Sequence, residues 1–176
     1  MARYQAGDFA AARSLIERIS PPLHRFFDAQ SVNRTDADDL LQDAWLRIHR
    51  ARHTYRPGKP LLPWIYAIAR CVRVDHYRRQ VRISTREQRL EGLSEVVPDA
   101  EGSQAPDLDE LLAPLSESQR EVLEMLKVAG MSLEEVALAT SCSVGSVKQK
   151  VHRAYEKLRQ TMSVVDLKKG QTGVVP

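Results

Sequence analysis

The sequence lacks the features that mark membrane proteins and most enzymes. Its 176 residues contain no apolar run of about 18 residues and no signal-peptide pattern. These absences predict a soluble, cytoplasmic protein with no segment inserted in a membrane. The sequence also has no phosphate-binding glycine loop, no zinc-ligand motif and no nucleophile beside an obvious base. We therefore expect no enzymatic activity, no metal and no cofactor.

Cysteine occurs only twice, at Cys71 and Cys142, without the spacing of metal ligands. Free thiols in a reducing cytosol are the expected state, and a redox-sensing pair stays open as the alternative. His49 and His53 are four residues apart and could share a metal ion. No third ligand follows at helical spacing, so we predict no metal site there.

Charge is unevenly distributed along the chain, although the net charge of +3 is only mildly basic. Arginines crowd residues 47–89, whereas residues 91–110 carry seven carboxylates and neither lysine nor arginine. The acidic segment is also rich in Gly, Ser, Pro and Ala, which predicts a linker. The predicted fold is all-α, with two small helical domains joined by this flexible acidic linker. The predicted boundaries are 1–90 for the first domain, 91–107 for the linker, 108–162 for the second domain and 163–176 for a flexible tail.

The most informative segment of the second domain lies between residues 132 and 158. Ser132 and Glu135 form a capping box for a short helix, and Ser143 is a suitable N-cap for a second, longer helix with one apolar and one basic face. This is the plan of a helix-turn-helix, in which the second helix enters the major groove of DNA. An ordinary helical hairpin with a solvated basic face is the alternative. The candidate DNA-binding residues are Ser146, Lys148, Gln149, Lys150, His152 and Arg153.

The first domain begins with a helical apolar pattern over residues 8–29. Pro21 and Pro22 remove backbone donors and clash within a helical turn, so we expect the helix to break there, with Ser20 capping the restart. A second helix is predicted to begin at Thr35. Its outward face combines carboxylates with an exposed leucine, which suits a basic protein surface, although a solvated acidic helix is the simpler interpretation. The candidate docking residues are Asp39, Gln42, Asp43 and Leu46.

A second nucleic-acid candidate lies in the predicted loop 55–62 and the helix that follows Pro63. One stripe of this helix interleaves aromatic and guanidinium groups, which suit unpaired bases and phosphates. The alternative is that Tyr66 and Trp64 belong to the core. The stripe consists of Tyr66, Arg70, Arg73 and Tyr77, and further arginines follow it at Arg78, Arg79, Arg82 and Arg86.

Two blocks of the sequence resemble the conserved regions of extracytoplasmic-function sigma factors, a group of the sigma-70 family. Residues 36–79, which begin DADDLLQDAWLRIHR, resemble region two, and residues 115–159, which contain SLEEVALATSCSVGSVKQKVHRAYEKLR, resemble region four. The resemblance implies a promoter-specificity subunit that directs transcription initiation and has no catalysis of its own. It implies core RNA polymerase and promoter DNA as partners, and an anti-sigma factor that is commonly anchored in the membrane.

The resemblance also implies a role for each candidate surface. Asp39, Gln42, Asp43 and Leu46 would dock on core polymerase, and the basic helix after Ser143 would bind the −35 element. The implied −10 residues are Tyr55, Arg56, Lys59, Arg70, Cys71, Arg73, Arg78 and Arg79. A conventional helix-turn-helix regulator, acting without polymerase, is the alternative function, and the aromatic and arginine stripe argues against it.

The chain departs from the family pattern at three places, which leaves its promoter sequence open. Cys71 stands where asparagine is frequent, beside the implied −10 surface. Ser141 occupies a turn position where glycine is frequent, so we expect strain or a changed turn type. Gln149 and Lys150 replace a more usual Ser-Arg pair in the helix implied to bind the −35 element.

Overall fold

The computed structural model describes residues 1–29, 34–90 and 112–171, and all regular structure in these ranges is helical. The segment predicted as an acidic linker lies outside the described residues. The first half of the chain contains α1 (Ala2–Gln5), α2 (Phe9–Asp28), α3 (Arg34–Ala51), a 3-10 turn (Arg52–Thr54) and α4 (Leu61–Leu90). The second half contains α6 (Glu117–Lys127), α7 (Leu133–Thr140) and α8 (Val144–Gln171).

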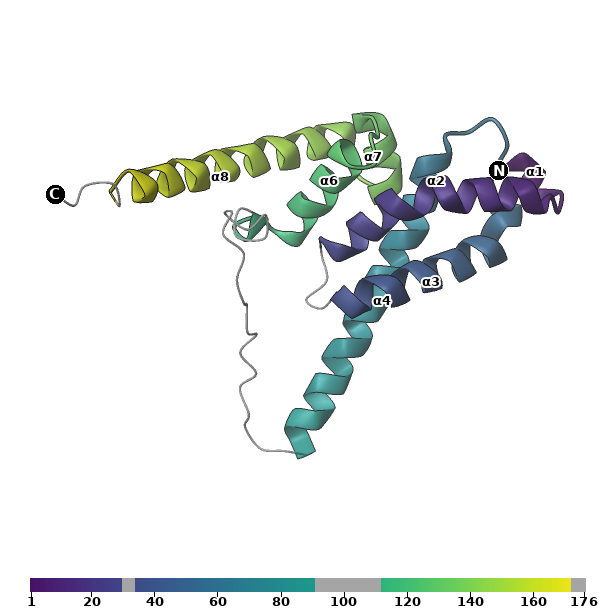
Figure 1. The fold of residues 1–176 in the computed structure, drawn as a ribbon, viewed down its shortest axis with the longest axis horizontal. Helices are drawn as coiled ribbons and strands as arrows, with labels where there is room; N and C mark the ends of the chain where they lie inside the picture. Colours follow the sequence, from purple (N-terminus) through teal and green to yellow (C-terminus); the bar gives the residue numbers. More distant parts are fainter. Residues whose placement is uncertain (30–33, 91–111, 172–176) are drawn as a thin grey trace.

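The N-terminal half is a bundle in which α3 packs against both α2 and α4 (Figure 1). Its centre is aromatic: the Phe26 ring meets the Tyr66 ring edge to face at 5.2 Å between centroids, and Phe27 at 5.5 Å. Ile48 of α3 and Ile65 of α4 complete this centre with no exposed surface. Edge-to-face contacts add to the burial of these large rings, so the centre fixes how α2 and α4 cross.

Helix α2 is continuous through Pro21 and Pro22, so the predicted break at these residues is wrong. The prolines leave the carbonyls of Glu17 and Arg18 without their usual helical donors. Both of these residues are exposed, which gives water access to the two carbonyls. Ser20 does not cap a new helix, because its Oγ accepts a hydrogen bond from Trp45 Nε1 at 2.9 Å and joins α2 to α3.

The helix starts of the C-terminal half follow the predicted capping chemistry. The capping boxes of Ser116 with Gln119 and of Ser132 with Glu135 are both formed. Ser143 Oγ accepts a hydrogen bond from the backbone N–H of Ser146 at 3.2 Å at the start of α8. These predictions are confirmed.

Helix α8 extends to Gln171, so the predicted loss of helical structure after residue 162 is wrong. The prediction was made because apolar residues stop recurring at helical spacing after residue 162. A helix that is already nucleated gains one hydrogen bond for each added residue, so it can continue without a buried stripe.

The two halves pack directly against each other, which the sequence pattern does not predict. Helix α7 lies against α4, and α6 contacts α2 (Figure 1). As a result, Met125 of α6, Val136 of α7 and Val147 of α8 belong to the same buried cluster as Phe26 and Tyr66. Within the described ranges, no helix is both long enough and apolar enough to cross a membrane.

Candidate nucleic-acid interface

The turn between α7 and α8 sets the direction of the basic helix. Ser141 closes α7 in the left-handed conformation, with φ 54° and ψ 37°. Its neighbour Cys142 donates its backbone N–H to the carbonyl of Ala137 at 3.0 Å, which satisfies the end of α7. A non-glycine residue in this conformation costs roughly 1–2 kcal/mol. The strain predicted for Ser141 is confirmed.

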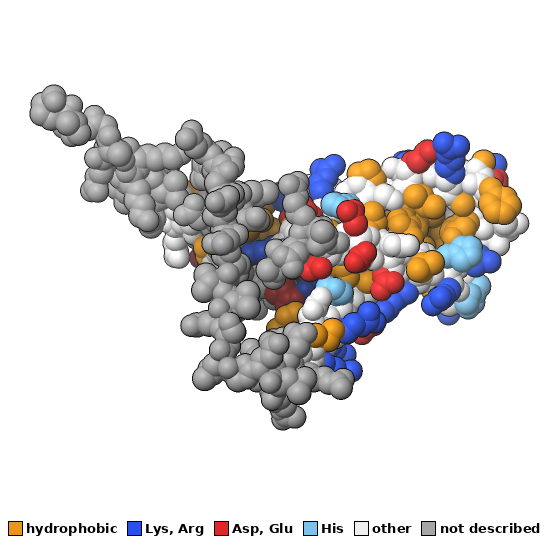
Figure 2. Space-filling model, turned by 60° about the horizontal axis from the view of Figure 1, so that its bottom comes forward, with side chains coloured by type: hydrophobic (Ala, Val, Ile, Leu, Met, Phe, Trp, Pro, Cys, Tyr) orange, Lys and Arg blue, Asp and Glu red, His pale blue; other side chains and the backbone are white. Residues whose placement is uncertain are grey.

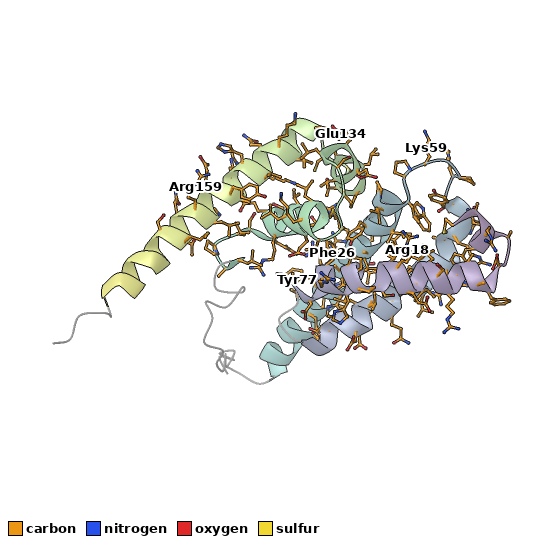
Figure 3. All side chains as sticks on the ribbon, turned by 45° about the horizontal axis from the view of Figure 1, so that its top comes forward. Arg18, Phe26, Lys59, Tyr77, Glu134 and Arg159 are labelled. Carbon is orange, nitrogen blue, oxygen red and sulfur yellow. The ribbon has the colours of Figure 1, made fainter. Side chains whose placement is uncertain are left out.

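Helix α8 is anchored along one side only. Val147 and Ala154 are fully buried, and Val151 packs beside them. The predicted −35 residues lie on the other sides of the same turns, and Figure 3 shows Arg159 further along the helix. Among the predicted residues, Lys148, Gln149, His152 and Arg153 are exposed, and Ser146 and Lys150 are half-buried.

Two of these side chains have partners within the second half. Lys150 Nζ lies 3.7 Å from the Cys142 sulfur, which holds this lysine beside the turn. His152 Nδ1 lies 3.4 Å from a carboxylate oxygen of Glu156, one turn further along α8. Both pairs are at or near the surface, where such contacts are weak and can be exchanged for a phosphate. The basic face of α8 is therefore accessible to a duplex.

The loop ahead of α4 presents two cations and conceals an aromatic ring. Tyr55 is 9% exposed, its ring packs edge-on against Trp64, and its hydroxyl donates to the backbone carbonyl of Lys59 at 2.5 Å. Tyr55 thus shapes the loop from inside. Arg56 and Lys59 are exposed at its tip, and Figure 3 shows Lys59 at the edge of the molecule.

Tyr66 does not belong to an exposed stripe, because it is fully buried against Phe26. Placing it on a nucleic-acid surface is therefore wrong, and the alternative that it belongs to the core is confirmed. Burial raises the pKa of its hydroxyl, and the nearby Glu124 raises it further. Tyr77, at the other end of the predicted stripe, is 63% exposed.

The arginines of α4 fall into two groups that the sequence does not separate. Arg70 and Arg73 face α6 and pair with its carboxylates, and the Arg73 side chain is only 10% exposed. Arg78 and Arg79, one to two turns further along, are exposed, as is Cys71. Only the second group lies on an open surface.

The partners of the first group are carboxylates of α6 that the sequence analysis did not single out. The two partners, Glu117 and Glu121, are four residues apart, which places them on one side of a helix. That spacing is the signal that could have identified an acidic face opposite the arginines of α4. Burial raises the pKa of Glu124, although Arg120 and Arg25 oppose this effect.

The outward face of α3 is acidic and lies opposite its buried stripe of Leu40, Ala44 and Ile48. Seen from below the view of Figure 1, acidic side chains gather beside a row of basic ones (Figure 2). All the predicted docking residues lie on this open face. Asp39, Gln42 and Asp43 are exposed, and Leu46 is 48% exposed.

An ion pair links this helix to α4. Arg47 Nη1 lies 2.6 Å from a carboxylate oxygen of Asp75, and this hydrogen bond lowers the pKa of Asp75. The bond joins the helix with the acidic face to the helix with the exposed arginines.

Comparison with known proteins identifies the family. The model of sigma-70 region 2 matches residues 15–83, and the model of sigma-70 region 4 matches residues 106–158. The RNA polymerase sigma factor CarQ of Myxococcus xanthus is 31% identical over 95% of this chain and 98% of its own. The ECF RNA polymerase sigma factor SigF of Caulobacter vibrioides is 31% identical over 94% of this chain and 93% of its own. The chain belongs to the extracytoplasmic-function sigma factors.

Two solved structures have the same fold. Sigma factor RpoE of Bartonella quintana, in complex with the anti-sigma factor NepR, is 26% identical and has a TM-score of 0.68 over 88% of this chain and 98% of RpoE. CnrH, in complex with the cytosolic domain of CnrY, has a TM-score of 0.70 over 93% of this chain and 94% of CnrH. At 23% identity, CnrH supports the fold alone.

The family assignment gives each surface of this sigma factor a place in a conserved region. The acidic face of α3, the loop ahead of α4 and the exposed arginines of α4 all lie within region 2. The basic face of α8 lies within region 4.

Proposed function

We propose that this sigma factor docks on core RNA polymerase through α3 and contacts a promoter at two separate elements, through α8 and through α4 with its preceding loop. The observation that carries this proposal is the accessible basic face of α8 within a region 4 sequence. A helix anchored along one side, with cations and amides on the other, has the shape and chemistry that the major groove accepts.

The −35 contact is assigned to the first three turns of α8. Lys148 and Arg153 are exposed cations that can neutralise phosphates or donate to guanine, and Gln149 is an exposed amide that can pair with adenine. Ser146, Lys150 and His152 lie around them on the same turns.

The −10 contact is assigned to the loop and the far part of α4. Arg56 and Lys59 at the loop tip, and Arg78 and Arg79 on α4, supply exposed positive charge. The exposed Tyr77 ring, next to Arg78 on α4, can stack on an unpaired base, an interaction worth roughly 1–3 kcal/mol. Tyr55 acts as a positioning residue for the loop, and Cys71 lies on the exposed side of α4.

The polymerase contact is assigned to the outward face of α3. Asp39 and Asp43 carry exposed negative charge beside the exposed leucine Leu46, a combination that suits a basic surface with an apolar centre. Helix α3 is held in place by its buried stripe and by Arg47, so it can accept a partner without refolding.

We further propose that an anti-sigma factor regulates this protein in the cytoplasm and that the protein performs no catalysis. The similarity to RpoE, solved in complex with the anti-sigma factor NepR, supports a partner of this class. Such a partner would compete with polymerase for the surfaces assigned above.

Transcription reconstituted with purified core polymerase and a pool of promoter fragments tests the proposal. We expect promoter-dependent transcripts that require this chain, and sequencing them identifies the promoter. A chain that binds duplex DNA tightly alone, and that fails to associate with polymerase, would instead be a conventional helix-turn-helix regulator.

The charge reversal Asp43→Lys tests the docking face directly. We expect a several-fold loss of polymerase affinity, because the new ammonium group would face a basic surface. The matched control is Glu17→Lys, which reverses an exposed carboxylate on α2 and should leave affinity unchanged. Affinity is measured by titrating labelled sigma factor with core polymerase, and circular dichroism checks that both variants are folded. Equal affinity for the two variants would remove Asp43 from the interface.

A further inference from the structure

The short helix α1 lies at the same end of the molecule as the loop ahead of α4 (Figure 1) and is bonded to the start of that loop. Gln5 donates from Nε2 to the backbone carbonyl of Arg52 at 2.6 Å and to that of Tyr55 at 2.8 Å. A primary amide nitrogen carries two N–H donors, so both donors of Gln5 are used. Gln5 therefore connects the beginning of the chain to a loop that follows about 50 residues later.

A second contact holds α1 against the end of α3. The Tyr4 hydroxyl lies 2.6 Å from His49 Nδ1, and the centroids of the two rings are 5.9 Å apart. The backbone carbonyl of His49 accepts from Arg52 Nη1 at 2.7 Å. Arg52 is thus bound at its carbonyl by Gln5 and at its guanidinium by α3. These contacts fix the 3-10 turn from which the loop begins.

Helix α1 has its own anchor on α2. Gly7 adopts φ 89°, a conformation that glycine reaches without strain, and turns the chain after α1. Asp8 then caps α2 by accepting from the backbone N–H of Ala11 at 2.9 Å, and it pairs with Arg3 of α1 at 2.7 Å. Since α1 is bound to α2 independently of the loop, it can act as a fixed support for the loop.

Tyr55 connects the support from Gln5 to the tip of the loop. Its backbone carbonyl binds Gln5, its ring packs against Trp64, and its hydroxyl donates to the carbonyl of Lys59. The backbone N–H of Lys59 donates to the carbonyl of Arg56 at 3.2 Å and closes the turn at the tip. The two exposed cations, Arg56 and Lys59, are therefore placed by a series of hydrogen bonds that begins at Gln5.

We infer that Gln5 is a positioning residue for promoter recognition, which holds the loop ahead of α4 so that Arg56 and Lys59 meet the −10 element in a preformed arrangement. This inference rests on the proposed function. It extends that function to α1, which lies outside the region 2 match that begins at residue 15. Both donors of Gln5 are used within the chain, so its effect on DNA is exerted through the loop. A loop that is already ordered avoids the entropic cost of ordering on binding.

The substitution Gln5→Met, made in the full chain, removes both donors and keeps a side chain of similar length that favours a helix. The loop is measured first, by hydrogen exchange at the backbone amides of Tyr55 and Lys59, which are bonded within the turn and the loop. We expect these amides to exchange several-fold faster than in the parent, while the buried part of α4 keeps its protection. The matched control is Gln160→Met, at an exposed glutamine of α8 outside the residues assigned to DNA.

Promoter binding is then measured with the chain assembled on core polymerase. The probe is a promoter duplex recovered from the transcribed pool, together with two derivatives in which the −10 or the −35 element is scrambled. We expect Gln5→Met to reduce the gain in affinity due to the −10 element about fivefold, as for a loop that is competent in about one fifth of the molecules. The gain due to the −35 element should not change. A residue that only stabilises the fold would alter both gains together or neither, and that result would overturn the inference.

The double substitution Arg56→Ala with Lys59→Ala separates failure of this inference from failure of the proposed −10 assignment. If the double variant loses the −10 gain while Gln5→Met keeps it, the loop contacts DNA but Gln5 does not position it. The inference is then overturned and the proposed function stands. If Gln5→Met loosens the loop and neither variant alters the −10 gain, the loop does not contact the −10 element, and the assignment and the inference both fail.

A milder substitution, Gln5→Asn, keeps the test independent of any instability of Gln5→Met. Asparagine retains the amide but withdraws it by one methylene, so bonds of 2.6 and 2.8 Å to the two carbonyls cannot both persist. We expect loop exchange and −10 gain between those of the parent and those of Gln5→Met, and thermal unfolding checks that both variants are folded. Parent-like values of both quantities in Gln5→Asn and Gln5→Met would overturn the inference.

Discussion

Helices α4 and α8 are both long, both rich in arginine and lysine, and both assigned to promoter DNA, yet their charges are not equally available. On α8 the cations Lys148 and Arg153 are exposed, because they lie away from the buried stripe of Val147 and Ala154. On α4 the middle of the helix carries α6 and α7, and Arg70 and Arg73 are taken up in that contact. Charge in a sequence therefore predicts a basic surface only where no second element covers the helix.

The two helices also differ in what their burial stabilises. Helix α4 is the central element of the first half, with Ile65, Tyr66, Ala69 and Val72 all buried. Helix α8 contributes Val147 and Ala154 and then extends away from the rest (Figure 1). A substitution in the core should thus destabilise α4, with its proposed −10 residues, more than α8, with its proposed −35 residues.

Phe26→Ala should have the largest effect on stability, because it removes the centre of the core on which α4 packs. Phe26 is fully buried against Tyr66, and removing such a ring costs about 3–5 kcal/mol in unfolding free energy. Urea denaturation measures the loss, and hydrogen exchange should show α2 and α4 losing protection before α8. The matched control, Phe9→Ala, removes a ring that is 90% exposed and should have little effect. Equal losses for both variants would contradict the packing described for α4.

Substitutions of single cations test whether α8 and α4 differ in their contribution to DNA binding. Lys148→Ala and Arg153→Ala should each lower the slope of log affinity against log salt by about one unit, because each removes one phosphate contact. Arg73→Ala should leave the slope of the isolated chain unchanged, because its guanidinium is already paired with carboxylates. The slopes are measured by anisotropy with a duplex of the identified promoter, and Arg13→Ala serves as the exposed control on α2. Unchanged slopes for both α8 variants would remove Lys148 and Arg153 from the interface.

Ser141→Gly, in the turn before α8, should raise the free energy of unfolding by about 1 kcal/mol. Glycine adopts φ 54° without the steric penalty of a side chain. Thermal unfolding measures the gain. Ser163→Gly, an exposed position within α8, is the control and should destabilise, since glycine is unfavourable inside a helix. A loss of stability for Ser141→Gly would show that the serine makes a compensating contact.

Glu124→Gln should give the smallest change in stability. Glu124 lies on α6, near Tyr66 of α4. Burial raises the pKa of Glu124, so the folded protein favours the neutral carboxyl, and its contribution to stability is lost as pH rises through the folded pKa. The variant should therefore unfold at a slightly higher temperature than the parent at neutral pH. The difference should vanish at acidic pH, where the parent carboxyl is also neutral in both states. A difference that grows on acidification would have the wrong sign for this explanation.

Local chemistry was predictable from the sequence, and contacts between distant elements were not. Ser116, Ser132 and Ser143 begin their helices as predicted, because capping needs only residues three positions apart. The exposed face of α3 also follows from its own periodicity. Tyr66 and Arg73 were predicted on a surface because no local pattern shows that α2 covers one and α6 the other.

The two errors about helix ends have local causes of a different kind. Pro21 and Pro22 were expected to break α2, but the carbonyls they leave unpaired belong to solvent-exposed residues. The length of α8 was underestimated because apolar periodicity indicates burial, whereas an exposed helix can continue without it. Periodicity therefore predicts contacts better than it predicts helix length.

The bond between Arg47 and Asp75 has a mechanical consequence. It adds a polar contact between α3 and α4, so docking through the acidic face of α3, as proposed, would also favour one direction for the exposed arginines of α4.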